Sequence, residues 1–223
     1  YKLLDLNTAV KQIHFPDSFD DFNLARKRLV FEELLSMQLA LLALKNQYSK
    51  DVKGIAFDKD AKMSDVINML PFKLTKAQLR VLEEIDSDME SDKRMNRLLQ
   101  GDVGSGKTIV AFTAIYANYL SKYQSALMAP TEILAGQHYE DALKIFSKYK
   151  LKIALLTSST SAKDKKEIYD NLELGKIDLI IGTQTLIQDK IKFKKLGLVI
   201  TDEQHRFGVN QRNSFKGKGI SPD

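Results

Sequence analysis

The sequence contains no cysteine, and only three of its 223 residues are histidines. The missing thiols exclude disulfide scaffolds, thiolate zinc sites and cysteine nucleophiles, and they fit the reducing environment of the cytoplasm. A long apolar run is also missing. A membrane span needs about 20 apolar residues, and Ser36 and Gln38 interrupt the longest run, at 34–44. The first five residues lack the pattern of a signal peptide. We therefore expect a cytoplasmic protein that makes no membrane contact.

The composition indicates a folded protein. Hydrophobic residues make up 43% of the chain and charged residues 28%, which is close to the values of globular domains and excludes wholesale disorder. The length is enough for one large domain, or for one domain with an appendage. The net charge of +5 permits a polyanionic partner without demonstrating one. Because the chain begins at Tyr1 and ends at Asp223 without a terminal helix, we expect a piece of a longer protein.

The pattern of the chain changes near Pro71, which is the expected hinge between residues 1–70 and residues 71–223. In the first part, apolar residues at helical spacing predict one long helix over about residues 20–48. In the second part, short apolar runs alternate with helical patterns. The predicted strands are 97–99, 126–129, 153–156, 178–181 and 198–201, and the predicted helices are 107–122, 131–149 and 161–174. This alternation indicates an α/β fold, a parallel sheet with helices on both faces, whose ligands bind beyond the carboxyl ends of the strands.

A glycine-rich turn follows the first predicted strand. Its sequence, GDVGSGKT at 101–108, fits the phosphate-binding pattern G-x-x-x-x-G-K-[ST]. Glycines let successive backbone N–H groups point at phosphate oxygens, and the following helix adds the positive end of its dipole. Lys107 can reach the β and γ phosphates, and the Thr108 hydroxyl can bind Mg²⁺. We therefore predict a nucleotide triphosphate site built from Gly101, Gly104, Ser105, Gly106, Lys107 and Thr108.

Two acidic residues, Asp202 and Glu203, follow the last predicted strand directly. Two acids after a strand usually form a solvated turn, but beside a phosphate-binding loop they supply the groups that the loop lacks. Asp202 is predicted to bind Mg²⁺, and Glu203 to orient and deprotonate the attacking water. For the neighbouring His205 a metal-ligand role is disfavoured, because the chain has few histidines and no cysteine. We favour a role in coupling the nucleotide site to a polymer site, with a plain turn residue as the alternative.

The segment Thr75-Lys76-Ala77-Gln78 precedes another helical pattern and allows two roles for Gln78. In a capping box, the Thr75 side chain accepts from the backbone of Gln78, and the Gln78 side chain reaches back to Thr75. Alternatively, the amide of Gln78 can read the edge of an adenine base, because it offers both a donor and an acceptor. The spacing by itself favours the cap.

Five segments, in this order, resemble the first motor lobe of the RecG family, superfamily 2 ATP-dependent DNA helicases that remodel stalled replication forks. They are residues 74–81, GDVGSGKT at 101–108, APTEILA at 129–135, IGT at 181–183 and DEQHRFGV at 202–209. The resemblance covers about residues 72–223. The motor of the transcription-repair coupling factor is less similar, because it typically has glutamate where Gln204 stands. Two departures from the RecG pattern are Gln184-Thr185, in place of His-Ala, and Gly136, in place of a longer residue.

This resemblance implies a RecA-like lobe over residues 71–223, preceded by a helical connector over residues 1–70 that links a fork-binding wedge to the motor. ATP and Mg²⁺ would be the ligands, with Gln78 reading the adenine, which reverses the preference for the cap, and with Phe72 against the base. The catalytic residues would be Lys107, Asp202 and Glu203.

The same resemblance implies a second site, for the DNA backbone, after two neighbouring strands. Its residues would be Pro130, Thr131, Thr183 and Gln184, whose hydroxyl and backbone N–H groups can bind phosphate without reading sequence. Helix capping is the alternative for the threonines. Gln204 and His205 would couple the DNA and ATP sites, and Arg206 and Arg212 would lie near the cleft between two lobes.

The implied function is that of the ATP-binding lobe of a translocase acting on branched double-stranded DNA, such as stalled forks and Holliday junctions in recombination and repair. The chain would end before the family's Thr-Ala-Thr motif, and its partners would be a second lobe and a wedge in one monomeric full-length protein. Because the second lobe supplies the arginine fingers, the chain alone is expected to bind Mg-ATP weakly and to hydrolyse it hardly at all. The alternatives are a transcription-repair coupling motor, a nucleotide sensor, which Glu203 disfavours, and a small-molecule kinase.

Overall fold

A computed structural model describes residues 2–51, 55, 67, 70, 72–91, 95–188 and 190–203, with the backbone alone over 45–51. The chain forms two compact units, Tyr1–Asp51 and Val52–Asp223, and each is described by itself. The predicted hinge, Pro71, lies outside the described residues, and the predicted boundary at residue 70 stays a prediction.

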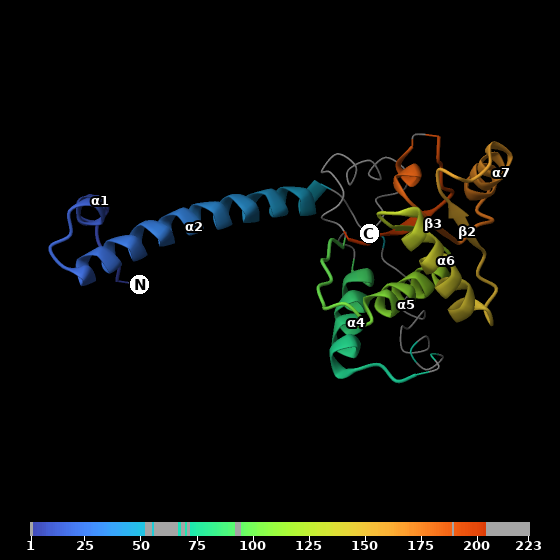
Figure 1. Ribbon diagram of the computed structural model, residues 1–223, viewed down its shortest axis with the longest axis horizontal. Helices are drawn as coiled ribbons and strands as arrows, with labels where there is room; N and C mark the ends of the chain where they lie inside the picture. The colour runs from blue at the N-terminus through green and yellow to red at the C-terminus, as the bar shows by residue number, and fades with distance from the viewer. Residues whose placement is uncertain are drawn as a thin grey trace. The chain divides into compact units, whose positions relative to one another are not determined.

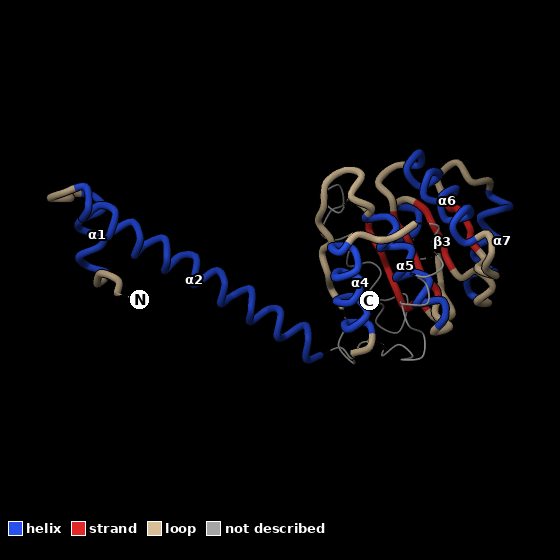
Figure 2. Tube along the Cα trace, turned by 90° about the horizontal axis from the view of Figure 1, so that it is seen from below, coloured by secondary structure: helices blue, strands red, loops and turns tan. Residues whose placement is uncertain are grey.

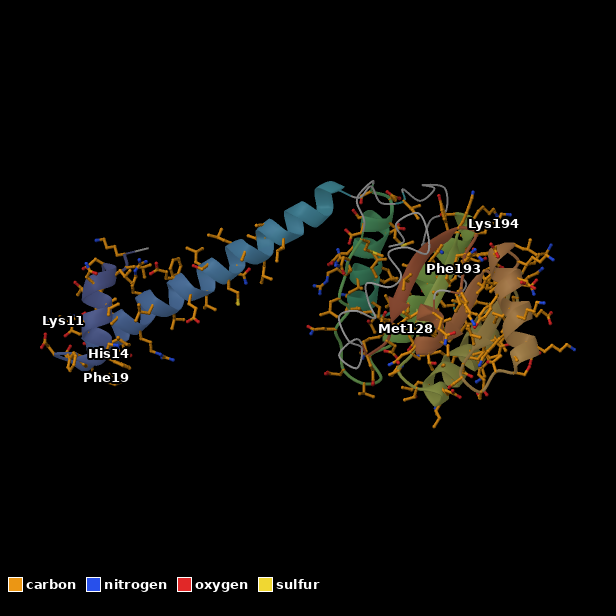
Figure 3. All side chains as sticks on the ribbon, turned by 90° about the horizontal axis from the view of Figure 1, so that it is seen from above. Lys11, His14, Phe19, Met128, Phe193 and Lys194 are labelled. Atoms are coloured by element: carbon orange, nitrogen blue, oxygen red, sulfur yellow. The ribbon has the colours of Figure 1, made fainter. Side chains whose placement is uncertain are left out.

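The first unit is a pair of helices, α1 (Leu6–His14) and α2 (Phe19–Asp51), which confirms the predicted long helix (Figure 1). Each helix has a side-chain cap, because Thr8 N donates to Asp5 Oδ1 at 3.0 Å and Asp21 N donates to Ser18 Oγ at 3.1 Å. Lys11 and His14, labelled in Figure 3, lie in the last turn of α1, where positive charge complements the helix dipole. None of the described helices is both long and apolar enough to cross a membrane.

The second unit contains a parallel sheet, as predicted. Its described strands are β1 (Gln124–Met128), β2 (Ile153–Leu156), β3 (Leu179–Gly182) and β4 (Leu196–Thr201), in the order β2-β3-β1-β4. The register places Met128 opposite both Gly182 and Thr201, and Leu156 opposite Gly182. The carboxyl ends of the described strands therefore meet at one edge. Figure 2 shows these strands in red.

Helices cover both faces of this sheet. Apolar residues of α4 (Lys76–Met89), α5 (Lys107–Leu120) and α6 (Glu132–Phe146) share one core with Leu127 and Ile181. On the opposite face, α7 (Ala162–Glu173) and the 3₁₀ helix η1 (Gln184–Ile187) pack with Ala126, Met128 and Phe193, of which the last two are labelled in Figure 3. Successive residues of β1 thus point to opposite faces, and burial on both explains why Ala126, Leu127 and Met128 are all apolar.

The predicted strand at 97–99 is wrong, because the described residues 95–100 form no strand. The Arg97 side chain binds acidic residues of α4, with Nε 2.8 Å from Asp88 Oδ2 and a second contact to Glu84. Leu98 is 65% exposed, whereas Leu99 packs against the core. The segment that precedes the glycine-rich turn is therefore held by the contacts of Arg97 with α4 and by the packing of Leu99 against the core.

Gly136, in the middle of α6, offers a test of helix stability. A Cβ atom added there meets nothing within 4 Å, and glycine within a helix costs about 0.8–1 kcal/mol relative to alanine. We expect Gly136→Ala to raise the free energy of unfolding by about 0.5–1 kcal/mol and Tm by roughly 1–4 °C, measured by thermal and urea unfolding. The matched control is Gly106→Ala, where φ is +81° and the Cβ would crowd the Gln78 amide, so the same change should lower Tm. An equal response at both sites would contradict this account.

Candidate nucleotide-binding site

The glycine-rich turn has the backbone shape that phosphate binding requires. Gly104 and Gly106 have φ angles of +79° and +81°, a left-handed conformation that residues with a Cβ rarely adopt. Ser105 N donates to Asp102 O at 3.1 Å, which closes the turn. Gly106 is the N-cap of α5 and provides no side-chain cap, so the positive end of α5 faces the turn. The backbone of the turn therefore has the shape expected of the predicted anion site.

Lys107 is the first residue of α5, and its ammonium group folds back over the start of the turn. Its Nζ donates to Gly101 O at 2.7 Å and to Asp102 O at 2.8 Å. Donors held this close to the turn can bind phosphate oxygens that enter it. The structure thus combines the backbone turn, the helix end and a positive charge in one place.

Gln78 connects α4 to this turn. Gln78 N donates to Thr75 Oγ1 at 3.2 Å and Thr75 N donates to Gln78 Oε1 at 2.8 Å, which confirms the predicted capping box. Gln78 Nε2 also donates to Ser105 O at 2.9 Å. One amide hydrogen and one acceptor lone pair remain for a ligand, so capping and adenine recognition are compatible. Recognition of adenine stays a prediction.

A cavity of about 430 Å³ lies beside the turn, between α4, α5 and α6. Its apolar lining includes Ile109, Phe112 and Ile145. Phe72, predicted to contact the base, lines it as well, with half of its surface exposed. A cavity of this size and apolar lining is typical of a small-molecule site. Asp141 and Lys144 line it as well. Sequence reasoning missed both residues because no motif contains them.

Asp202 lies at the carboxyl end of β4, on the same edge as the turn. Its backbone N–H donates to Met128 O at 2.8 Å, and its Oδ1 accepts from Glu203 N at 2.9 Å. Its Oδ2 accepts from Nε2 of His138, on α6, at 2.9 Å. The hydrogen bond from His138 is the largest cause that lowers the pKa of Asp202, and the charge of Lys107 lowers this pKa further. The carboxylate is thus ionised at neutral pH and within the electrostatic reach of Lys107.

His138 is a site residue that sequence reasoning missed. Its side chain is 12% exposed, and it lies on α6 two turns after Thr131, outside the APTEILA segment at 129–135. A single histidine within a helix carries no signal of its own. Only the packing of α6 beside the end of β4 shows its partner, which is 64 residues away along the chain.

The four residues predicted to contact DNA lie at the ends of β1 and β3, which are adjacent strands. Thr131 is the N-cap of α6, and its hydroxyl accepts from Leu134 N at 3.2 Å, which confirms the capping alternative for Thr131, whereas Thr183 precedes η1 without a side-chain cap. Thr183 is 9% exposed and its Oγ1 lies 3.5 Å from that of Thr185, whereas Gln184 is exposed. Contact between these residues, including Pro130, and DNA stays a prediction.

Glu132, in the first turn of α6, contacts the loop that follows β2, a connection that the sequence did not suggest. Its carboxylate accepts from Ser158 N at 3.0 Å, from Ser159 Oγ at 2.8 Å and from Ser158 Oγ. These hydrogen bonds, above all those from Ser158, lower the pKa of Glu132. The first turn of α6 is therefore fastened to the loop that follows β2.

The sequence is similar to that of known helicases. A family model described as DEAD/DEAH box helicase matches residues 75–218. The chain belongs to this helicase family. It is 52% identical to the ATP-dependent DNA helicase RecG of Bacillus subtilis and 49% identical to that of Thermotoga maritima, covering 100% of the chain in both comparisons but 33% and 28% of these relatives. The chain thus spans about a third of the length of the relatives it matches, and the resemblance to RecG is confirmed.

Solved structures agree with this assignment. The structure of RecG bound to a three-way DNA junction matches 93% of the chain, and 28% of that protein, with a TM-score of 0.83 and 48% identity. A hypothetical ATP-dependent RNA helicase from Sulfolobus tokodaii matches 74% of the chain, and 48% of that protein, with a TM-score of 0.55. Its identity of 17% supports the fold alone. The predicted RecA-like helicase fold is confirmed.

ATP is the nucleotide that such helicases use, and the donors around the turn fit a magnesium ion beside it. Thr108 lines the cavity next to the turn, and Asp202 supplies an ionised carboxylate. Among the described residues, no three acidic or histidine side chains gather as a metal site. Mg²⁺ binds one or two protein ligands and takes its other ligands from phosphates and water, and its binding by Thr108 and Asp202 stays a prediction.

Four of the predicted residues cannot be placed. Gln204 and His205, expected to couple the sites, and Arg206 and Arg212, expected near the cleft, lie outside the described residues. Glu203, the predicted base, is exposed and has a φ of +49°. This left-handed backbone turns the chain sharply after β4, so that Asp202 and Glu203 do not continue the alternating pattern of the strand.

Proposed function

We propose that this chain is the ATP-binding lobe of an ATP-dependent DNA helicase that remodels branched DNA, such as stalled replication forks and Holliday junctions, in recombination and repair. The observation that carries the proposal is the common edge of the sheet. There the charge of Lys107, at the glycine-rich turn, reaches Asp202 after β4, and Thr131 and Gln184 follow the ends of β1 and β3. With an ATP site and a DNA site on one edge, ATP hydrolysis at the first can be coupled to movement of DNA at the second.

Each residue of the site has a role in hydrolysis. The turn and Lys107 bind the triphosphate, while Gln78 and Phe72 hold the adenine in the adjoining cavity. Thr108 and Asp202 would hold Mg²⁺, which supplies charge stabilisation to the phosphates when bound. Glu203 orients the attacking water and accepts its proton. A second lobe of the full-length protein would contribute arginine residues, which are worth about 10³–10⁵ in rate.

The proposed substrate follows from the residues at the ends of β1 and β3. Pro130, Thr131, Thr183 and Gln184 would hold the DNA backbone through hydroxyl, amide and N–H groups, which position a duplex without reading its sequence. A translocating motor needs contacts of this kind. The name of the relatives and the junction in the RecG structure support branched DNA as the substrate. The full protein would act as a monomer in the cytoplasm, with a wedge domain at the fork.

Glu203→Gln in the full-length protein separates a motor from a nucleotide sensor. A motor should bind ATP normally but lose roughly 10²–10⁴-fold in turnover, because the amide cannot accept the proton of water. Phosphate release, measured with a three-way junction and with linear duplex of equal length, reports both the loss and the preference for branched DNA. The matched control is Glu167→Gln, an exposed glutamate on α7. Unchanged turnover in Glu203→Gln, or equal stimulation by both DNAs, would contradict the proposal.

A further inference from the structure

His138 joins two parts of the molecule that carry different predicted sites. Its Nε2 lies 2.9 Å from Asp202 Oδ2, and because the ionised carboxylate can only accept, the nitrogen donates. The other oxygen, Oδ1, accepts from Glu203 N, and the backbone of Asp202 is bonded to Met128 O. His138 is therefore the side-chain donor that fixes the direction of the carboxylate.

The helix that bears His138 begins at the predicted DNA edge. Thr131 caps α6, and Glu132 in its first turn binds the loop after β2. His138 lies seven residues beyond Thr131, about 10 Å along the helix at 1.5 Å per residue. Ala135 and Ala142, both fully buried, seat the same helix against the sheet. A shift of the first turn of α6 must therefore move His138 with it.

We propose that His138 is a positioning residue, which aims the Asp202 carboxylate for Mg-ATP and links that aim to DNA bound at the first turn of α6. The inference rests on the proposed function, because it takes Asp202 as the magnesium-binding residue and Thr131 as a DNA contact. It assigns the coupling of the two sites to a residue of α6, in addition to the acidic turn where sequence reasoning had placed it.

A purely structural role for His138 makes a different prediction. If the imidazole only fills space between α6 and β4, a side chain of similar shape should replace it at little cost to either ligand. If it aims the carboxylate, removing the donor should weaken the magnesium-dependent part of ATP binding, since hydrogen-bond partners of metal ligands change metal affinity by about 10–100-fold. Binding of ATP without magnesium should not change.

The test compares His138→Phe, which keeps a flat ring and removes the donor, with His138→Gln, which offers an amide N–H in its place. In the full-length protein, binding of a fluorescent non-hydrolysable ATP analogue is titrated with Mg²⁺. We expect His138→Phe to need about tenfold more Mg²⁺ for half-maximal tight binding, and His138→Gln to return to within about threefold of the parent protein. The control is Gln137→Ala, the exposed neighbour on α6, which should match the parent.

The second readout is the ratio of ATP turnover with and without a three-way junction. We expect this ratio to fall about tenfold in His138→Phe and to recover in His138→Gln. Should His138→Phe fail to fold, His138→Asn, whose amide is too short to reach Asp202, must show the same raised magnesium requirement. An unchanged magnesium requirement in the donor-less variant overturns the inference. A parent protein without DNA-stimulated turnover would overturn the proposed function instead, while the magnesium titration would still decide the positioning of Asp202.

Discussion

Lys107→Ala in the full-length protein is expected to lower ATP turnover by roughly 10²–10³-fold, because a preorganised donor at the developing charge is worth that much. The ammonium group of Lys107 already lies against the turn, bonded to the carbonyl groups of Gly101 and Asp102. Phosphate release in the presence of junction DNA measures the loss. Affinity for ATP should fall less, since the backbone N–H groups of the turn and the end of α5 remain.

The fold should survive this substitution. Lys107 begins α5, but the helix is held by buried residues further along, including Ile109, Val110 and Phe112. Thermal unfolding of Lys107→Ala should therefore resemble that of the parent. The matched control is Lys163→Ala, an exposed lysine in the first turn of α7, on the opposite face of the sheet. Turnover within a factor of about three of the parent would mean that the triphosphate lies elsewhere.

Much of the fold could be predicted because strands covered on both faces have a simple signature. Runs such as Ile153–Leu156 and Leu179–Gly182 are apolar at nearly every position, and both form paired strands as expected. The second run is buried throughout, whereas the first, at the edge of the described sheet, is fully buried only at Leu156. The run at 97–99 has the same signature over too short a length. Its two leucines face different environments, and Arg97 binds α4 instead of accompanying a strand. Three residues do not distinguish a strand from an extended segment that packs by one side chain.

The candidate site likewise contains residues that could be predicted from the sequence and residues that could not. The turn at 101–108 and the pair Asp202-Glu203 could be predicted because each is one continuous segment whose residues act together. His138 and Glu132 could not be predicted, because their partners lie 64 and 26 residues away and are brought close only by the packing of α6. Gln78 stands between these cases: its cap is local, whereas its bond to Ser105 O spans 27 residues. Functional groups within one continuous segment can be predicted from the sequence, whereas contacts between distant segments depend on the fold.

A second large effect is expected at Gln124, the first residue of β1, which is 5% exposed. Its Nε2 donates to Leu172 O at 3.0 Å and to Ile177 O at 2.7 Å, and its Oε1 accepts from Lys194 N at 2.8 Å and Lys195 N at 3.0 Å. One buried amide thus links the end of α7 to the residues that precede β3 and β4. Gln124→Met keeps the shape and leaves four backbone groups without this partner. We expect a loss of roughly 3–6 kcal/mol in the free energy of unfolding.

Urea unfolding of the chain measures this loss, with Gln137→Met as the control. Gln137 is exposed on α6, and substitution at such a surface position should change the free energy by no more than about 0.5 kcal/mol. Gln124→Glu provides an independent check, because a carboxylate would face the two carbonyl oxygens that Nε2 now binds and should destabilise the chain as well. A loss below about 1 kcal/mol in Gln124→Met would mean that other groups satisfy the four backbone partners. In that case Gln124 would not be what holds β1, β3 and β4 at the register that brings Asp202 to the nucleotide edge.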